Sequence, residues 1–80
     1  MLDPKLIGQW IAAGLPCEHV TVEGDGHHFQ AVIVCREFAG LNRVKRQQRV
    51  NALLKERFDS GELHALSMQT LTPEEWSARG

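Results

Sequence analysis

The stretch GDGHHF, residues 24–29, contains the side chains of this chain that are best suited to chemistry. Asp25 and Gly26 are typical of a tight turn, because Asp can bond its own backbone and Gly tolerates a positive φ. Two histidines follow at once, His27 and His28, where an ordinary hairpin needs only strand-forming residues. The turn is therefore a candidate for presenting imidazole groups to a ligand.

The segments on either side of this turn are predicted to form an antiparallel hairpin. Residues 17–24 alternate apolar and polar side chains, which is typical of a half-buried strand. Residues 28–35 carry apolar side chains on both sides, which indicates the central strand of a sheet. A third strand is predicted over residues 63–71, and the helix before it allows this strand to run parallel to a neighbour.

A third histidine, His64, lies at the start of the third predicted strand. The starts of parallel neighbouring strands lie at the same end of a sheet, so His27, His28 and His64 are expected to lie close together. Two or three imidazoles form an incomplete metal site, since Zn²⁺ or an iron–sulfur cluster usually takes four ligands, and a partner protein can complete it. The alternative is that His27 is a solvated turn residue and that the other two are partly buried strand residues. On the residues alone this alternative is favoured, because no spacing matches a closed ligand motif.

A basic cluster occupies the middle of the chain, although the whole chain has a net charge of −1. Residues 36–57 contain seven basic and two acidic side chains, and a helix from about 43 to 58 would group several of them on one patch. Such a patch can bind the phosphates of nucleic acid or an acidic protein. The alternative is an ordinary solvated helix face.

Helices are also predicted at both ends of the chain. Asp3 followed by Pro4 is typical of a helix start, and Gly14 of a helix end. The segment TPEEW, residues 72–76, has the pattern of a capping box. The helix over residues 43–58 has predicted core positions at Val50, Leu53, Leu54 and Phe58. This order predicts an α+β fold with a three-stranded mixed sheet and helices packed on one face.

The length of 80 residues is that of one small domain. Hydrophobic residues make up 42% and charged residues 24%, as in a soluble globular protein. No apolar run approaches the roughly 20 residues of a membrane span, and the N-terminus has no signal-peptide pattern. The cytoplasm is therefore the expected location, with no membrane partner.

The remaining residues give no indication of catalysis. No Ser/His/Asp or Cys/His pair is suggested by its context, and the glycines do not form a phosphate-binding loop, so the protein is expected not to be an enzyme. Cys17 and Cys35 form no CxxC motif. Two buried thiols are expected, and a bridge across the hairpin stays an open alternative.

Three segments of the chain together resemble the BolA family: GDGHHFQAVIV, FAGLNRVKRQQRVNALL and ELHALSMQTLTPEEW. The turn and the RVKRQQ sequence look like the IbaG/YrbA-like branch of that family, which is linked to acid stress. The resemblance covers about residues 20–76, and HAL…TPEEW is its most specific part. It implies a class II KH-like fold with the element order α-β-β-α-α-β, as a single BolA-like domain over residues 1–80.

The resemblance also implies a partner, a monothiol glutaredoxin of the CGFS type. Family members share a [2Fe–2S] cluster with this partner, whose cysteine and a glutathione thiolate hold one side of the cluster. The cofactor is thus expected only in the complex, and the free protein is expected to be a monomer or a weak dimer. The residues that match the ligands of the family are His64, in the HAL strand, and His28, which precedes Phe29. His27 is the less favoured rival of His28.

Members of the family are also described as transcriptional regulators tied to stress and cell shape, so a DNA-binding regulator is the alternative function. Nucleic-acid-binding KH domains have a GxxG loop, whereas this chain has Gly40–Arg43, GLNR, at that position. The second glycine, which allows a close backbone approach to phosphate, is missing. If DNA binds, the expected contacts are Arg43, Lys45, Arg46 and Arg49.

Overall fold

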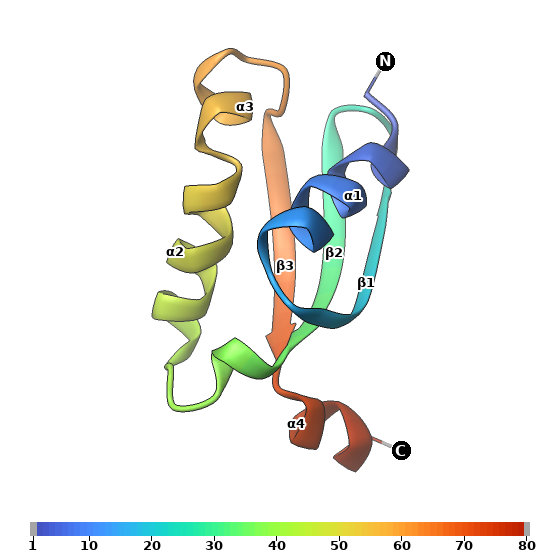
Figure 1. The fold of residues 1–80 in the computed structure, drawn as a ribbon. Coiled ribbons are helices and arrows are strands. Elements are labelled where there is room, and N and C mark those ends of the chain that lie inside the picture. The colour runs from blue at the N-terminus through green and yellow to red at the C-terminus, as the bar shows by residue number, and fades with distance from the viewer. Residues whose placement is uncertain (1, 80) are drawn as a thin grey trace.

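Three strands form one mixed sheet in the computed structural model, which describes residues 2–79 (Figure 1). β1 (Cys17–Gly24) and β2 (His28–Cys35) are antiparallel, and β3 (Ala65–Leu71) runs parallel to β2, so the strand order is β1-β2-β3. The two strands of the hairpin begin and end where the alternation of apolar residues predicts. The predicted α+β fold with a mixed sheet is confirmed.

The helical elements follow the predicted order. They are α1 (Pro4–Gly14), the short 3₁₀ helix η1 (Arg36–Phe38), α2 (Arg43–Leu53), α3 (Lys55–Asp59) and α4 (Pro73–Ala78). The side chains of Asp3, Asn42 and Thr72 cap α1, α2 and α4 by accepting hydrogen bonds from backbone N–H groups of the first turn. None of the helices within residues 2–79 is long and apolar enough to span a membrane.

The prediction of a single helix over residues 43–58 is wrong in one respect. This segment forms two helices, α2 and α3, which are separated at Leu54. Leu54 has φ −100° and ψ 6°, which lies outside the helical region, and its side chain is fully buried. Leu53, the last residue of α2 before this break, does not lie in the core. Leu53 was predicted to face the core, but it is 39% exposed and its side chain lies over Gly14 at the end of α1.

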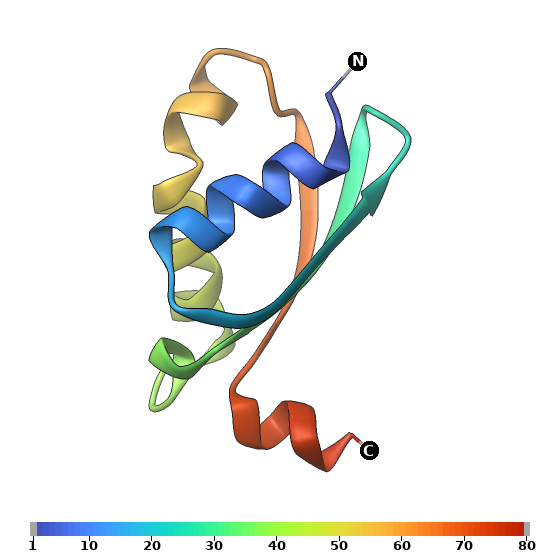
Figure 2. The ribbon, with the colours of Figure 1, turned by 45° about the vertical axis from the view of Figure 1, so that its right-hand side comes forward.

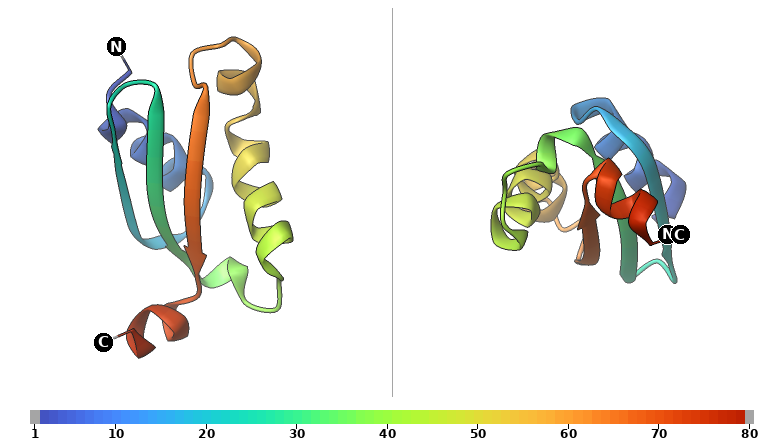
Figure 3. Two further views of the ribbon diagram at one scale, coloured as in Figure 1. Left: turned by 180° about the vertical axis from the view of Figure 1, so that it is seen from behind. Right: turned by 90° about the horizontal axis from the view of Figure 1, so that it is seen from below.

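The core lies between one face of the sheet and the helices α1 and α2 (Figures 2 and 3). Its largest fully buried side chains come from every layer: Ile7, Ile11, Phe29, Ile33, Phe38, Val50, Leu54 and Leu63. A chain of this size buries only a thin core, so polar groups that could bind a partner lie near the surface. The ends of the sheet and its second face are the places where such groups gather.

The predicted C-terminal helix is confirmed as α4, with its capping box at Thr72 and Glu75. It follows β3 at the end of the sheet opposite the β1–β2 turn (Figure 1), and Trp76 stacks on His19 of β1, with ring centroids 4.6 Å apart. His19 and its register partner Val34 lie on the face that α1 and α2 leave open, and Val34 is fully buried there. Trp76 thus fastens α4 to the open face of the sheet, not to the core.

Candidate metal centre

The turn between β1 and β2 is held in shape by Asp25. Its Oδ1 accepts hydrogen bonds from the backbone N–H groups of His27 and His28, both at 2.9 Å. These two bonds hold the pKa of the Asp25 carboxyl below its ordinary value, with the bond from His28 as the larger cause. Gly26 has a φ of 100°, a conformation that favours glycine. The turn therefore presents His27 from a defined backbone.

Gly24 allows the end of β1 to pass close to the start of β2. A Cβ atom on Gly24 would lie 2.5 Å from the carbonyl oxygen of His28 and 2.5 Å from Cδ1 of Phe29. Phe29 is a core residue, only 2% exposed, so it has little room to move. The close approach of the two strands at this point therefore depends on the missing side chain.

Gly24→Ala is expected to lower the free energy of unfolding by roughly 1–3 kcal/mol, because the added methyl group overpacks against backbone and a buried ring. Urea unfolding would measure the change. Gly8→Ala is the matched control, since its Cβ would sit at an ordinary 3.7 Å from Val22, and it should be neutral or stabilising by up to about 1 kcal/mol. A Gly24→Ala protein as stable as the unaltered one would show that the turn adapts freely.

The structure brings His27 and His64 together. Their ring centroids are 6.4 Å apart and the ring planes are inclined by 38°. The parallel register pairs His28 with Ala65, so His27 and His64 each lie one residue before these partners, at the same end of the sheet. Both side chains are exposed. Two imidazoles from positions far apart in the sequence are thus placed side by side at the surface.

His28 was expected to be the first choice for the loop ligand, but the structure places His27, not His28, beside His64. Side chains alternate between the two faces of a strand. Phe29 faces the core, and so does Leu66 in part, which places His27 and His64 two residues earlier on that same side. His28 lies on the opposite side, in line with Gln30, and is exposed there.

Two imidazoles alone do not form a closed metal site. Within residues 2–79, no group of three or more His, Cys, Asp or Glu side chains is arranged to hold a metal ion. Two imidazoles bound to one metal through bonds of about 2.1 Å have ring centroids roughly 5 Å apart. Rotation of two exposed side chains can close the gap from 6.4 Å. The pair therefore offers two of the four ligands that a closed site takes.

The four candidate phosphate-binding residues of α2 differ in their surroundings. The guanidinium of Arg46 donates to the carbonyl oxygens of Leu41 (2.8 Å) and Thr70 (3.1 Å) and to the carboxylate of Glu75 (2.7 Å). Its side chain is only 14% exposed. Arg46 therefore joins the start of α2 to β3 and α4, and this part of the predicted patch is structural.

The other three basic residues lie at the surface. Arg49 forms an ion pair with Glu37, whereas the structure gives Arg43 and Lys45, both exposed in the first turn of α2, no ion-pair partner within residues 2–79. The pKa of the Glu75 carboxyl lies below its ordinary value, mainly because it accepts a hydrogen bond from Arg46. The hydrogen bond from the backbone N–H of Thr72 is the second cause. Of the predicted patch, Arg43 and Lys45 are the free cationic groups.

The sequence of this chain matches a known protein family. A family model described as BolA-like protein matches residues 14–75, most of the chain. The chain belongs to the BolA family. One curated relative is the acid stress protein IbaG of Escherichia coli strain K12, to which the chain is 43% identical over 63 residues. The matched residues make up 79% of this chain and 75% of that protein. This similarity places it in the IbaG-like branch, as predicted.

Two other comparisons extend this result. The solved structure of a bolA protein homologue from Coxiella burnetii matches this BolA-like chain with a TM-score of 0.87 and 40% identity, covering 96% of this chain and 99% of that one. The DNA-binding transcriptional regulator BolA of Haemophilus influenzae is 39% identical over 61 residues, which is 76% of this chain and 58% of that protein.

The two cysteines of the BolA-like chain lie at the end of the sheet away from the histidine pair. Cys17 and Cys35 are partners in the β1–β2 register, and both are free thiols. The pKa of Cys17 is raised to about 11, and burial is the largest cause. The neighbouring Cys35 thiol is the second cause. The Cys17 thiol is thus protonated at neutral pH, the form in which a thiol is a weak nucleophile.

Proposed function

We propose that this BolA-like protein is a non-enzymatic adaptor that binds a [2Fe–2S] cluster jointly with a monothiol glutaredoxin of the CGFS type. The observation that supports the proposal is the pair of His27 and His64, two exposed imidazoles that lie side by side at one end of the sheet. The partner's cysteine and a glutathione thiolate would supply the remaining ligands. The resemblance to the family provides the identity of this partner.

The residues of this chain position the two ligands in different ways. His64 directly precedes β3, whose pairing with β2 fixes its backbone. His27 is held by the turn that Asp25 stabilises. The cluster, when bound, supplies one-electron redox chemistry and an iron–sulfur unit for transfer, and neutral nitrogen ligands on one side raise its potential relative to an all-thiolate site. The protein thereby contributes two neutral donors from a rigid edge of its sheet.

Visible circular dichroism tests the proposal. Titration of a cluster-loaded monothiol glutaredoxin with this protein should replace the spectrum of the glutaredoxin homodimer by a new one that saturates at one protein per glutaredoxin. Glutaredoxin without cluster, mixed with the protein under the same conditions, is the control for signals that do not come from iron. A homodimer spectrum that stays unchanged at excess protein would refute the proposed function.

A second candidate function is DNA binding, which the H. influenzae relative carries in its name. The observation that favours it here is the exposure of Arg43 and Lys45 in the first turn of α2, where the positive end of the helix adds to their charge. The loop before α2 lacks the second glycine of a GxxG motif. Contacts to phosphate would therefore depend on these side chains and less on the backbone.

Arg43→Glu with Lys45→Glu is expected to reduce affinity for duplex DNA and to lower the slope of log affinity against log salt by about 2, one for each lost phosphate contact. Fluorescence anisotropy at several salt concentrations would measure both quantities. Lys55→Glu, at an exposed position in α3, is the matched control and should leave the slope unchanged. Equal losses in both variants would indicate a general charge effect instead of a DNA site.

A further inference from the structure

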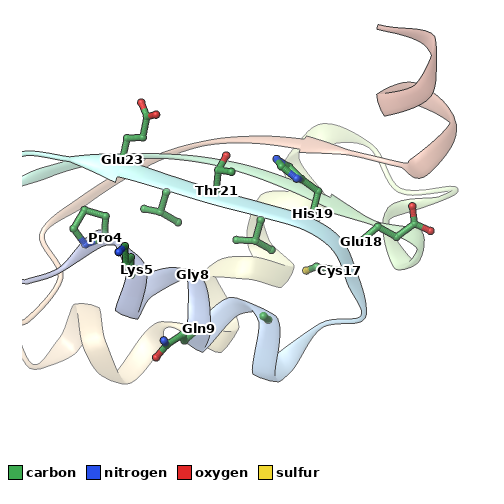
Figure 4. A pocket seen from close by; sticks show the side chains of 12 residues that line it. Pro4, Lys5, Gly8, Gln9, Cys17, Glu18, His19, Thr21 and Glu23 are labelled. Carbon is green, nitrogen blue, oxygen red and sulfur yellow. The ribbon is translucent and has the colours of Figure 1, made fainter. Parts of the chain in front are cut away.

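A groove of about 640 Å³ lies between α1 and β1 (Figure 4). Its lining comes from residues 4–12 and 17–23, so it shares no residue with the histidine pair or with α2. β1 is an edge strand without a second strand partner in the described part of the chain, and α1 packs against it. Backbone N–H and C=O groups along the outer side of β1 are therefore free to pair with an added strand.

The floor of the groove is formed by small apolar residues. Val20 and Val22 of β1 face α1 and are half-buried. Opposite them, α1 presents Gly8 and Ala12. Because Gly8 has no side chain, this part of the groove is open, and a Cβ there would make only ordinary contacts with Val22 (3.7 Å) and Val20 (3.8 Å). The groove thus has room for side chains of an extended chain lying beside β1.

The charges around the groove indicate the type of chain that fits. Glu18 and Glu23 are exposed at the two ends of β1 and point away from α1 (Figure 4). Lys5 is the one cationic side chain among the residues that line the groove, against the carboxylates of Glu18 and Glu23, and residues 1–35 carry four acidic side chains against this lysine alone. A second copy of this protein that paired with β1 would place its own two carboxylates near Glu18 and Glu23. This arrangement is unfavourable because like charges repel. A basic segment would meet complementary charge at both ends.

We infer that this groove binds an extended basic peptide segment of a partner protein, which adds to the sheet as a fourth strand along β1. Backbone hydrogen bonds would hold the segment, and alternate side chains would enter the groove over Gly8, as in other cases of strand addition. Two basic residues five positions apart would match Glu18 and Glu23. This inference does not depend on the cluster site.

The probe is an acetylated and amidated hexapeptide of sequence KVTVTK. In an antiparallel register its lysines lie opposite Glu23 and Glu18, and its valines lie opposite Val22 and Val20. The matched control peptide has glutamates in place of both lysines. In ¹⁵N–¹H spectra of the free protein, the lysine peptide should shift the amide signals of residues 17–24 and 4–12 and should bind roughly tenfold more tightly than the glutamate peptide.

Variants of the protein separate the contributions of charge and space. Glu18→Lys with Glu23→Lys should reverse the preference between the two peptides. Gly8→Leu should weaken binding of the lysine peptide at least tenfold, whereas Gly8→Ala should bind it normally. If Gly8→Leu does not fold, the charge-reversed variant still decides the matter, because its changes are on exposed side chains.

Four results would overturn the inference. They are the absence of binding of the lysine peptide at millimolar concentration, equal affinity for both peptides, shifts that map to β3 or to the open face, and concentration-dependent shifts along β1 without peptide, which would make a second copy the occupant. None of these bears on the glutaredoxin complex, so this inference and the proposed function can fail separately.

Discussion

His64→Ala is expected to abolish the mixed cluster with a monothiol glutaredoxin and to leave the circular dichroism spectrum of the glutaredoxin homodimer. His64 directly precedes β3, and its ring lies beside that of His27. The described chain has no group of three or more potential ligands from which a substitute could come. Loss of a direct ligand should cost at least the roughly 10–100-fold in affinity that loss of an outer hydrogen-bond partner costs.

His27 and His28 provide a matched pair of variants for the second ligand. They are adjacent, both are exposed, and both donate a backbone N–H to Asp25, so replacing either side chain leaves these backbone bonds possible. His27→Ala is expected to weaken formation of the mixed cluster at least tenfold, and His28→Ala to leave it nearly unchanged. The reverse result would mean that the turn rearranges in the complex. A His64→Ala protein that still gives the spectrum of the unaltered complex would refute the ligand role altogether.

Arg46→Ala is expected to lower the free energy of unfolding by about 2–4 kcal/mol. The substitution removes charge-assisted hydrogen bonds to two backbone carbonyl groups and leaves the partly buried acceptors on Leu41 and Thr70 without their donor. Arg49→Ala, on the same helix, should cost less than about 1 kcal/mol, because its ion pair with Glu37 is half-exposed. Urea unfolding monitored by tryptophan fluorescence and far-ultraviolet circular dichroism would compare the two. Similar losses in both variants would contradict the structural role of Arg46.

The effect of Arg46 should also depend on pH. The folded-state pKa of Glu75 is lowered, first by the bond from Arg46. A lowered folded-state pKa contributes stability above the unfolded-state value of about 4.3, and this contribution is lost as the pH falls through the folded-state pKa. The difference between the unaltered protein and Arg46→Ala is therefore expected to be largest near neutral pH and to shrink below about pH 4. Unfolding curves at a series of pH values would test this trend.

Local rules in the sequence predict most of the fold. The alternation in residues 17–24, the continuous apolar run in residues 28–35 and the capping box at Thr72 all agree with the structure, because each depends on neighbours a few residues away. The exposure of Leu53 could not be predicted in the same way. It depends on how α2 packs against the end of α1, where the Leu53 side chain lies over Gly14, a contact between residues far apart in the sequence.

The candidate site was predictable in its components and less so in its geometry. The end of the sheet at which the histidines meet follows from a parallel third strand, which the sequence indicates. The choice of His27 over His28 depends on which residues face the core, and Phe29 and Leu66, each two positions after a histidine, carry that information. The structural role of Arg46 depends on Thr70 and Glu75, 24 and 29 residues away, so no local pattern could predict it.

The parallel pairing of β3 with β2 gives the two ends of one strand different neighbours. His64 lies just before its start, and Arg46 bonds to Thr70 near its end, close to the first turn of α2. The seven residues of β3 span roughly 20 Å, well beyond the distance at which substitutions usually influence one another. Mutations at either end should therefore act additively. The basic first turn of α2 can therefore change during evolution without affecting the imidazole pair. The imidazole pair can likewise change without affecting the basic turn.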